Sequence, residues 1–128
     1  MDRRIAQVWR AAAAQALSAA RTLTSENVRG MCNRLYYAMF SHAHALLIEA
    51  GKSPREHRGT WSHTKLPGFV DPHLRSYMRA SKAREYRALL LRARQFREYA
   101  DYHPGLFIES IAAIKLFDDV ESTLGNYL

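Results

Sequence analysis

Apolar residues recur every three or four positions along most of this chain, which is the repeat of an amphipathic helix. The repeat predicts helices over about residues 2–23, 25–50, 71–102 and 108–124, and Ser81 is a candidate break in the third of them. No stretch alternates apolar and polar residues as a half-buried strand does. We therefore expect a single all-α domain over residues 1–128, built as a bundle of four to five helices.

Capping residues and helix breakers indicate where these helices begin. Thr24 or Ser25 is a suitable N-cap for the second helix. Asp71 and Pro72 are expected to start the third, because Asp caps a helix and Pro fits its first turn. Residues 52–70 contain two prolines and two glycines, and this composition predicts a loop.

The charge of the chain bears on its partners. Nineteen Lys and Arg oppose twelve Asp and Glu, which gives a net charge of +7, and fifteen of the nineteen are arginine. Arginine binds phosphate through planar, bidentate contacts, so RNA or DNA is one candidate partner, and the arginine content of a high-GC genome is the alternative explanation. Cys32 is the only cysteine, which excludes an internal disulfide. No apolar run approaches the length of a membrane span, so we expect a cytoplasmic protein without a membrane partner.

The second predicted helix carries a polar stripe opposite its apolar face. A polar stripe usually faces solvent, but this one contains neither Lys nor Glu, and its make-up also fits a semi-buried cleft or interface. Its members are Asn27, Gly30, Arg34, Tyr37, Ser41 and His44, with Asn33 beside them.

An arginine and a histidine lie close together near the end of the third predicted helix. Arg97 and His103 have five residues between them, and Pro104 disfavours helical geometry at His103, so its imidazole can turn at the helix end. A phosphate-binding Arg beside a titratable His is what cleavage of an RNA backbone needs. Arg58 and His63 have similar spacing, but they lie in the predicted loop and are the less favoured pair.

Two runs of the sequence resemble signatures of the short bacterial and archaeal HEPN proteins. Residues 33–40 read Asn-Arg-Leu-Tyr-Tyr-Ala-Met-Phe and continue through His-Ala to Ala-Leu-Leu at residues 45–47. This run is similar to the second-helix signature of the family. The run from Arg97 to Gly105 contains Ala-Asp-Tyr and then Pro-Gly, which resembles the second signature. The resemblance covers about residues 25–125.

The resemblance implies an up-and-down helical bundle that forms a homodimer. Many members of this family are metal-independent ribonucleases of toxin–antitoxin, phage-defence or CRISPR-linked systems. Their catalytic pattern is an Arg followed after four to six residues by a His, and Arg97 and His103 match it. The implied reaction is cleavage of single-stranded RNA by attack of the 2′-hydroxyl, and we expect neither a metal nor a cofactor.

Roles for individual residues follow from this interpretation. Arg97 would hold the scissile phosphate and His103 would take the proton of the 2′-hydroxyl. The partner chain's His103 is the natural acid for the leaving oxygen, with Tyr102 or Tyr37 as weaker candidates. Auxiliary or cleft-lining residues are expected at Arg34, Tyr37, His44, Glu98, Asp101 and Tyr102, and RNA contacts at Arg84, Arg87, Arg92 and Arg94.

Three departures from the family pattern keep other functions open. In this subgroup the position of His103 is often not His, and such members lack the catalytic pair. Glu98 stands where Asn, Asp or His is common. Gly105 stands where toxins paired with small nucleotidyltransferases carry a modifiable Tyr. The alternatives are a non-catalytic HEPN module that partners a nucleotidyltransferase-type antitoxin or binds RNA or a nucleotide, and a purely structural helical protein. The placement of His103 relative to Arg97 distinguishes the enzyme from the binding module.

Overall fold

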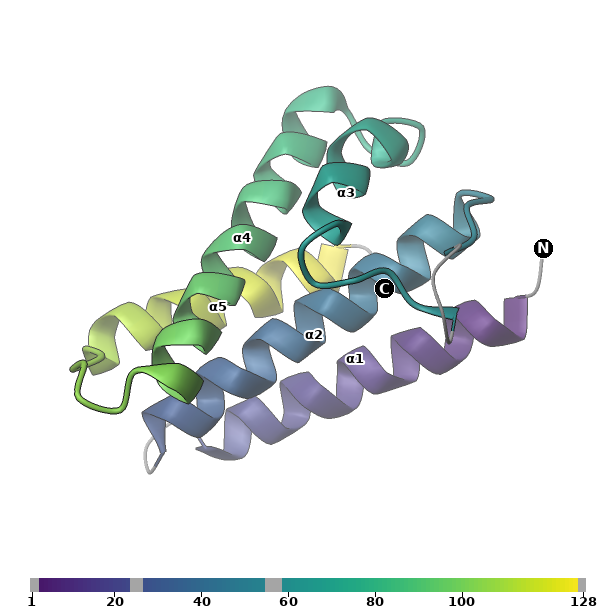
Figure 1. Cartoon of the computed structure of the whole chain (residues 1–128). Coiled ribbons are helices and arrows are strands. Elements are labelled where there is room, and N and C mark those ends of the chain that lie inside the picture. The colour runs from purple at the N-terminus through teal and green to yellow at the C-terminus, as the bar shows by residue number, and fades with distance from the viewer. Residues whose placement is uncertain (1–2, 24–26, 55–58, 127–128) are drawn as a thin grey trace.

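The computed structural model describes residues 3–23, 27–54 and 59–126, and these residues form five helices and no strand. The helices are α1 (Arg3–Leu23), α2 (Val28–Glu49), α3 (Leu66–Leu74), α4 (Ala80–Tyr102) and α5 (Ser110–Asn126), as shown in Figure 1. The all-α bundle expected from the sequence is confirmed. The expected caps Thr24 and Ser25 lie outside the described residues, and the observed N-cap of α2 is Asn27, whose side chain accepts the backbone N–H of Gly30 at 2.8 Å.

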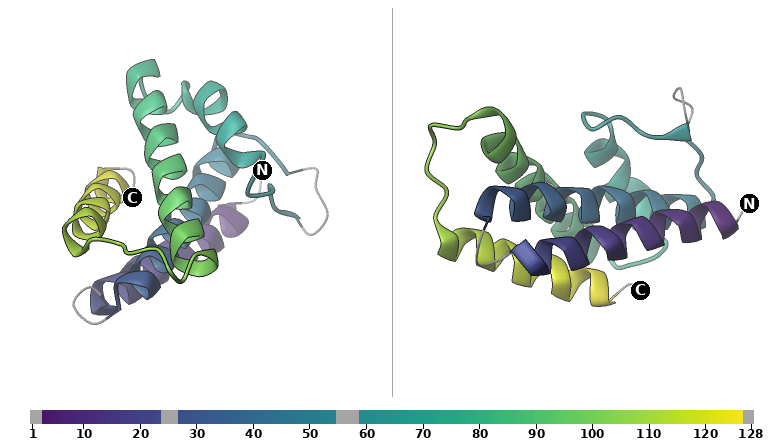
Figure 2. Two further views of the ribbon diagram at one scale, coloured as in Figure 1. Left: turned by 60° about the vertical axis from the view of Figure 1, so that its left-hand side comes forward. Right: turned by 90° about the horizontal axis from the view of Figure 1, so that it is seen from below.

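Helix α2 is the centre of the bundle. It runs beside α1 along its length, and α3, α4 and α5 also pack against it (Figure 2). From Met31 to Ile48, every side chain except those of Asn33, Arg34 and Tyr37 is buried. An α-helix buried on nearly all sides needs apolar partners all round, and the other four helices supply them. The predicted polar stripe is therefore divided, because Ser41 and His44 lie in the core.

The prediction for the start of the third helix was wrong. Helix α3 begins at Leu66, and Pro67 lies in its first turn, where the missing N–H of proline costs nothing. Pro67 and Gly68 are helix breakers and favour a loop. Leu66, Val70 and Leu74 nevertheless recur at helical spacing, and their side chains lie buried on one face of α3. Residues 75–79 then separate α3 from α4, so the break falls before Ser81 and produces two helices.

His44 connects three parts of the core. Its ring stacks on Trp9 of α1 with 4.2 Å between centroids. Its Nδ1 donates to the carbonyl oxygen of Phe40 at 2.9 Å, and its Nε2 accepts the backbone N–H of Trp61 at 3.0 Å. Both contacts fit the neutral imidazole with its proton on Nδ1. Burial lowers the pKa of His44 to about 4.

The buried His44 predicts that the bundle loses stability in acid. The folded protein holds this imidazole neutral, whereas the unfolded chain protonates it near its ordinary pKa of 6.5. A lowered folded pKa gives stability that is complete above about pH 6.5 and is lost as the pH falls toward 4. We expect a loss on the order of 2 to 3 kcal/mol between pH 7 and pH 4 from this group. Urea unfolding across this range measures it.

The matched control for this measurement is His44→Gln. The amide keeps an acceptor for the Trp61 N–H but does not titrate. The variant should be less stable at pH 7, and its free energy of unfolding should depend less on pH between 4 and 6.5. Equal slopes for the two proteins would show that His44 is not the responsible group.

Candidate functional site

Arg97 is the centre of a polar and aromatic cluster on the inner side of α4. Its Nε donates to Oδ2 of Asp101 at 2.9 Å, and its Nη2 donates to the hydroxyls of Tyr102 at 3.2 Å and Tyr37 at 3.4 Å. The guanidinium carbon lies 5.7, 5.6 and 5.2 Å from the ring centroids of Tyr36, Tyr37 and Tyr102. Such cation–π contacts orient a guanidinium. The side chain is 16% exposed, so the charge is partly buried but reachable.

A second layer of contacts holds Asp101. Asn33 of α2 donates its side-chain amide to Oδ2 of Asp101 at 2.9 Å. Arg34 donates to Oδ1 of Asn33 through Nε at 2.9 Å and Nη2 at 2.6 Å, and its guanidinium lies 5.2 Å from the ring centroid of Tyr37. Asp101 thus forms its ion pair with Arg97 of the same helix, and Arg34 is linked to it only through Asn33. Residues of the two signature runs therefore meet in one network between α2 and α4.

Arg29 holds the end of α4 in place, a role that its neighbours in sequence do not indicate. Its guanidinium donates to a series of carbonyl oxygens at the C-terminus of α4 and in the turn that follows. The acceptors of Nη1 are Tyr99, Ala100 and His103, and those of Nη2 are Pro104 and Leu106. The last carbonyls of a helix lack partners within the helix, and a cation near them is also favoured by the helix dipole. Arg29 thereby anchors the second signature run to the start of α2.

His103 lies at the C-cap of α4 and is exposed. Its backbone has φ −128° and ψ 70°, which is the departure from helical geometry expected before Pro104. Its ring contacts that of Tyr99 at 6.1 Å between centroids. Among the contacts of the described residues, none joins His103 to Arg97. A single chain therefore brings Arg97 together with Tyr37, Asp101 and Tyr102, and leaves His103 at the solvent-exposed edge.

A different histidine lies beside the cluster. His63 belongs to the turn before α3, and its Nδ1 is 2.5 Å from the hydroxyl of Tyr36. Its ring stacks on Phe40 with 4.5 Å between centroids. The sequence pairs His63 with Arg58 by spacing, but Arg58 lies outside the described residues. Burial, followed by the charges of Arg97 and Arg94, lowers the pKa of His63.

The arginines predicted to contact RNA do not share one face of α4. Arg84 is exposed, and Arg87 donates to the carbonyl oxygen of Pro67. Arg94 pairs with Glu98 at 3.2 Å, one turn from Arg97. The remaining member of the set, Arg92, instead donates to Asp119 of α5 at 2.7 Å.

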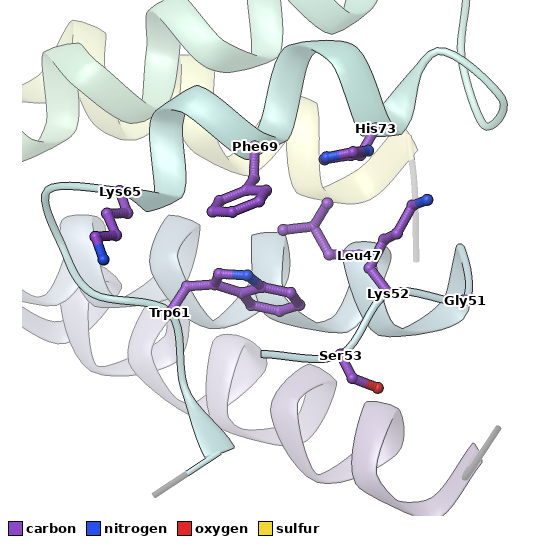
Figure 3. Close-up of a pocket in the computed structure, with 8 residues that line it drawn as sticks. All are labelled: Leu47, Gly51, Lys52, Ser53, Trp61, Lys65, Phe69 and His73. Atoms are coloured by element: carbon purple, nitrogen blue, oxygen red, sulfur yellow. The ribbon is translucent and has the colours of Figure 1, made fainter. Parts of the chain in front are cut away.

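A cavity of about 690 Å³ lies between α3 and the C-terminal end of α2 (Figure 3). Trp61 and Phe69 form an aromatic wall with 6.1 Å between ring centroids, and Lys52 and Lys65 lie at its rim. None of the site residues predicted from sequence lines this cavity. An aromatic wall with cationic neighbours fits a flat, anionic ligand.

The comparisons with known proteins agree with the signature residues. No helix among the described residues is both long and apolar enough to cross a membrane. Searches of curated proteins and of solved structures returned no match. The model of the HEPN domain family matches residues 6–125, which is nearly the whole 128-residue chain. The five-helix bundle and the meeting of both signature runs at Arg97 are consistent with this match, and the chain belongs to the HEPN domain family.

Proposed function

We propose that this protein is a metal-independent endoribonuclease that cleaves single-stranded RNA. The observation that carries the proposal is Arg97, a partly exposed guanidinium held by three tyrosines at the position of the family's catalytic arginine. A fixed cation of this kind stabilises charge that develops on the non-bridging oxygens of a phosphodiester. Membership of the family favours a place in a toxin–antitoxin or phage-defence system in the cytoplasm.

The geometry leaves part of Arg97 available for a phosphate. Nε binds Asp101 and Nη2 binds two tyrosine hydroxyls, while Nη1 has no hydrogen-bond partner among the described residues. A phosphate can therefore bind at Nη1 while the guanidinium stays oriented. His103 supplies acid–base chemistry from the helix end, where its non-helical backbone lets the ring reach substrate. Attack of the 2′-oxygen leaves a 2′,3′-cyclic phosphate and a 5′-hydroxyl, and DNA resists because it lacks the attacking group.

A homodimer suits this reaction, because a second chain can bring another His103 to the same substrate. The turn after α4 and the start of α5 carry an apolar patch, which we define as Leu106, Phe107, Ile111 and Ile114. Phe107 is 82% exposed and Ile111 is 81% exposed. Adjoining exposed side chains of this size favour a protein interface. The patch begins three residues after His103, so a dimer formed through it brings the two helix ends together.

The second candidate is a non-catalytic module that binds RNA or a nucleotide, or partners a nucleotidyltransferase-type antitoxin. Two observations favour it. His103 contacts Tyr99 in place of Arg97, so the described contacts of a single chain do not assemble the Arg–His pair. The cavity beside Trp61 and Phe69 also offers an aromatic surface for a base.

Removing either member of the catalytic pair should abolish most of the cleavage. His103→Ala should lower the rate by about 10²–10⁴-fold, the usual contribution of general acid–base catalysis. Arg97→Ala should have an effect at least as large, because it removes the phosphate ligand. The assay is digestion of single-stranded RNA in excess EDTA, with DNA of the same sequence as the resistant substrate.

His73→Ala is the matched control, because His73 lines the separate cavity and contacts Phe69. It should cleave at the wild-type rate. Circular dichroism establishes that each variant is folded. Wild-type protein as inert as both site variants would leave only the binding-module interpretation.

RNA binding should weaken steeply with salt. Each phosphate contact releases counterions, so a lost contact reduces the slope of log affinity against log salt by about 0.7 for a single strand. Arg94→Gln should produce this change, because Arg94 lies one turn from Arg97. Arg92→Gln is the matched control. Each variant loses one ion pair, Arg94 with Glu98 and Arg92 with Asp119 of α5, but only Arg94 lies near Arg97, so Arg92→Gln should leave the slope unchanged. Equal slopes for the two variants would contradict this RNA path, and fluorescence anisotropy provides the measurement.

The apolar patch predicts the oligomeric state. The wild-type protein should be a dimer by light scattering at micromolar concentration, and Phe107→Glu should make it a monomer by placing a charge in the patch. Val8→Glu is the matched control, since Val8 is 68% exposed on α1, away from the patch, and its variant should remain dimeric. A monomeric wild type, or a dimeric Phe107→Glu variant, would show that this patch is not the interface.

A further inference from the structure

His63 and Arg97 lie on the same pair of tyrosine rings. The centroid of the His63 ring is 5.4 Å from that of Tyr36 and 6.1 Å from that of Tyr37. The Arg97 guanidinium carbon is 5.7 Å and 5.6 Å from the same two centroids. The imidazole and the guanidinium therefore contact the same two tyrosines in a single chain, although 34 positions separate them in sequence.

The His63 ring is held in a defined orientation. Tyr36 bonds Nδ1, Phe40 stacks on one face, and the backbone is fixed in a turn in which the N–H of Lys65 donates to Oγ of Ser62. Nε2 has no hydrogen-bond partner among the described residues. When Nδ1 carries the proton and donates it to the Tyr36 oxygen, Nε2 presents a lone pair. The half-buried ring is thus oriented by one nitrogen and leaves the other for a ligand.

We propose that His63 is the imidazole of the Arg97 site within each chain, and that it takes the proton of the ribose 2′-hydroxyl of RNA bound there. This inference rests on the proposed ribonuclease function and assigns one of its steps. The base role expected for His103 passes to His63, and His103 is left to act as the acid.

The charges around His63 suit a base. Tyr36, Tyr37 and His44 face it from α2, and Arg94 and Arg97 face it from α4. Burial and the two arginines lower its pKa, so the imidazole is neutral near pH 7 and able to accept a proton. A phosphate bound at Arg97 would oppose the arginine charges and raise the pKa of His63 toward the value of a stronger base.

The step is balanced by two proton transfers. Nε2 of His63 takes the 2′-hydroxyl proton as the 2′-oxygen forms its bond to phosphorus. The bond from phosphorus to the 5′-oxygen breaks, and that oxygen takes a proton from His103. Arg97 compensates the charge on the non-bridging oxygens throughout. The products are the cyclic phosphate and the 5′-hydroxyl, with one proton moved from His103 to His63 and exchanged through solvent afterwards.

An NMR titration tests whether His63 contacts bound RNA, and it does not depend on cleavage. The probe is single-stranded RNA with 2′-O-methyl groups, which cannot undergo the attack. Imidazole signals are assigned by their loss in His63→Asn. The pKa of His63 should rise by roughly one unit when the probe binds, and Arg97→Gln should raise it in the free protein. An unchanged His63 pKa with saturating probe would overturn the inference.

Cleavage assays then separate the proton transfer from a structural role. The amide of His63→Asn can keep the contact with Tyr36 but cannot exchange a proton. It should lower kcat by about 10²–10⁴-fold with little change in KM, and remove the acidic limb of the pH–rate profile. Lys82→Gln is the control, because Lys82 lies at the opposite end of α4 from Arg97, and it should retain both the rate and the acidic limb.

The outcomes separate a failure of the role proposed for His63 from a failure of the proposed ribonuclease function. If the wild type cleaves RNA and His63→Asn matches its rate and pH profile, His63 is not the base and the ribonuclease proposal stands. If the wild type is inert, the ribonuclease proposal and the proton transfer both fail. A pKa shift with the probe would still support His63 as a residue of the RNA-binding site.

Discussion

The burial of α2 on nearly all sides is the constraint on which the rest of this bundle depends. A polar group placed on such a helix must find a partner inside the protein, because water does not reach it. Each polar ring on α2 therefore reaches another segment: His42 bonds the Tyr86 hydroxyl of α4, His44 accepts the Trp61 N–H, and Tyr36 bonds His63. These bonds connect α4 and the segment before α3 to the central helix.

The candidate site occupies the small part of α2 that remains open. Asn33, Arg34 and Tyr37 are the only side chains from Met31 to Ile48 that are not buried, and Arg97 docks against this opening from α4. Arg29 fixes the same end of α4 through its last carbonyls. Both signature runs thus contribute to packing as well as to the site, so a variant of either run needs a folding control.

Local patterns predicted the bundle, because helical repeats are visible within a few turns, and they placed Arg97 near the end of a helix. The same patterns gave the wrong start for α3, because Pro67 and Gly68 predict a loop and obscure the helical repeat from Leu66 to Leu74. The burial of His44 and the roles of Arg29 and His63 depend on contacts between residues far apart in the chain, and nothing in their neighbouring residues indicates them. Arg29, for example, binds carbonyls more than seventy positions later.

The contacts of Arg97 explain why this position suits arginine and not lysine. One planar group donates from Nε to Asp101 and from Nη2 to two tyrosine hydroxyls, and it still has Nη1 available. A lysine ammonium is a compact charge, so a bond to Asp101 would draw it away from the rings and from a phosphate. Asp101 is itself fixed by Asn33, which lets the carboxylate orient the guanidinium without moving toward solvent. The ion pair at Arg97 is therefore compatible with phosphate binding, since the carboxylate and the phosphate use different edges of the same fork.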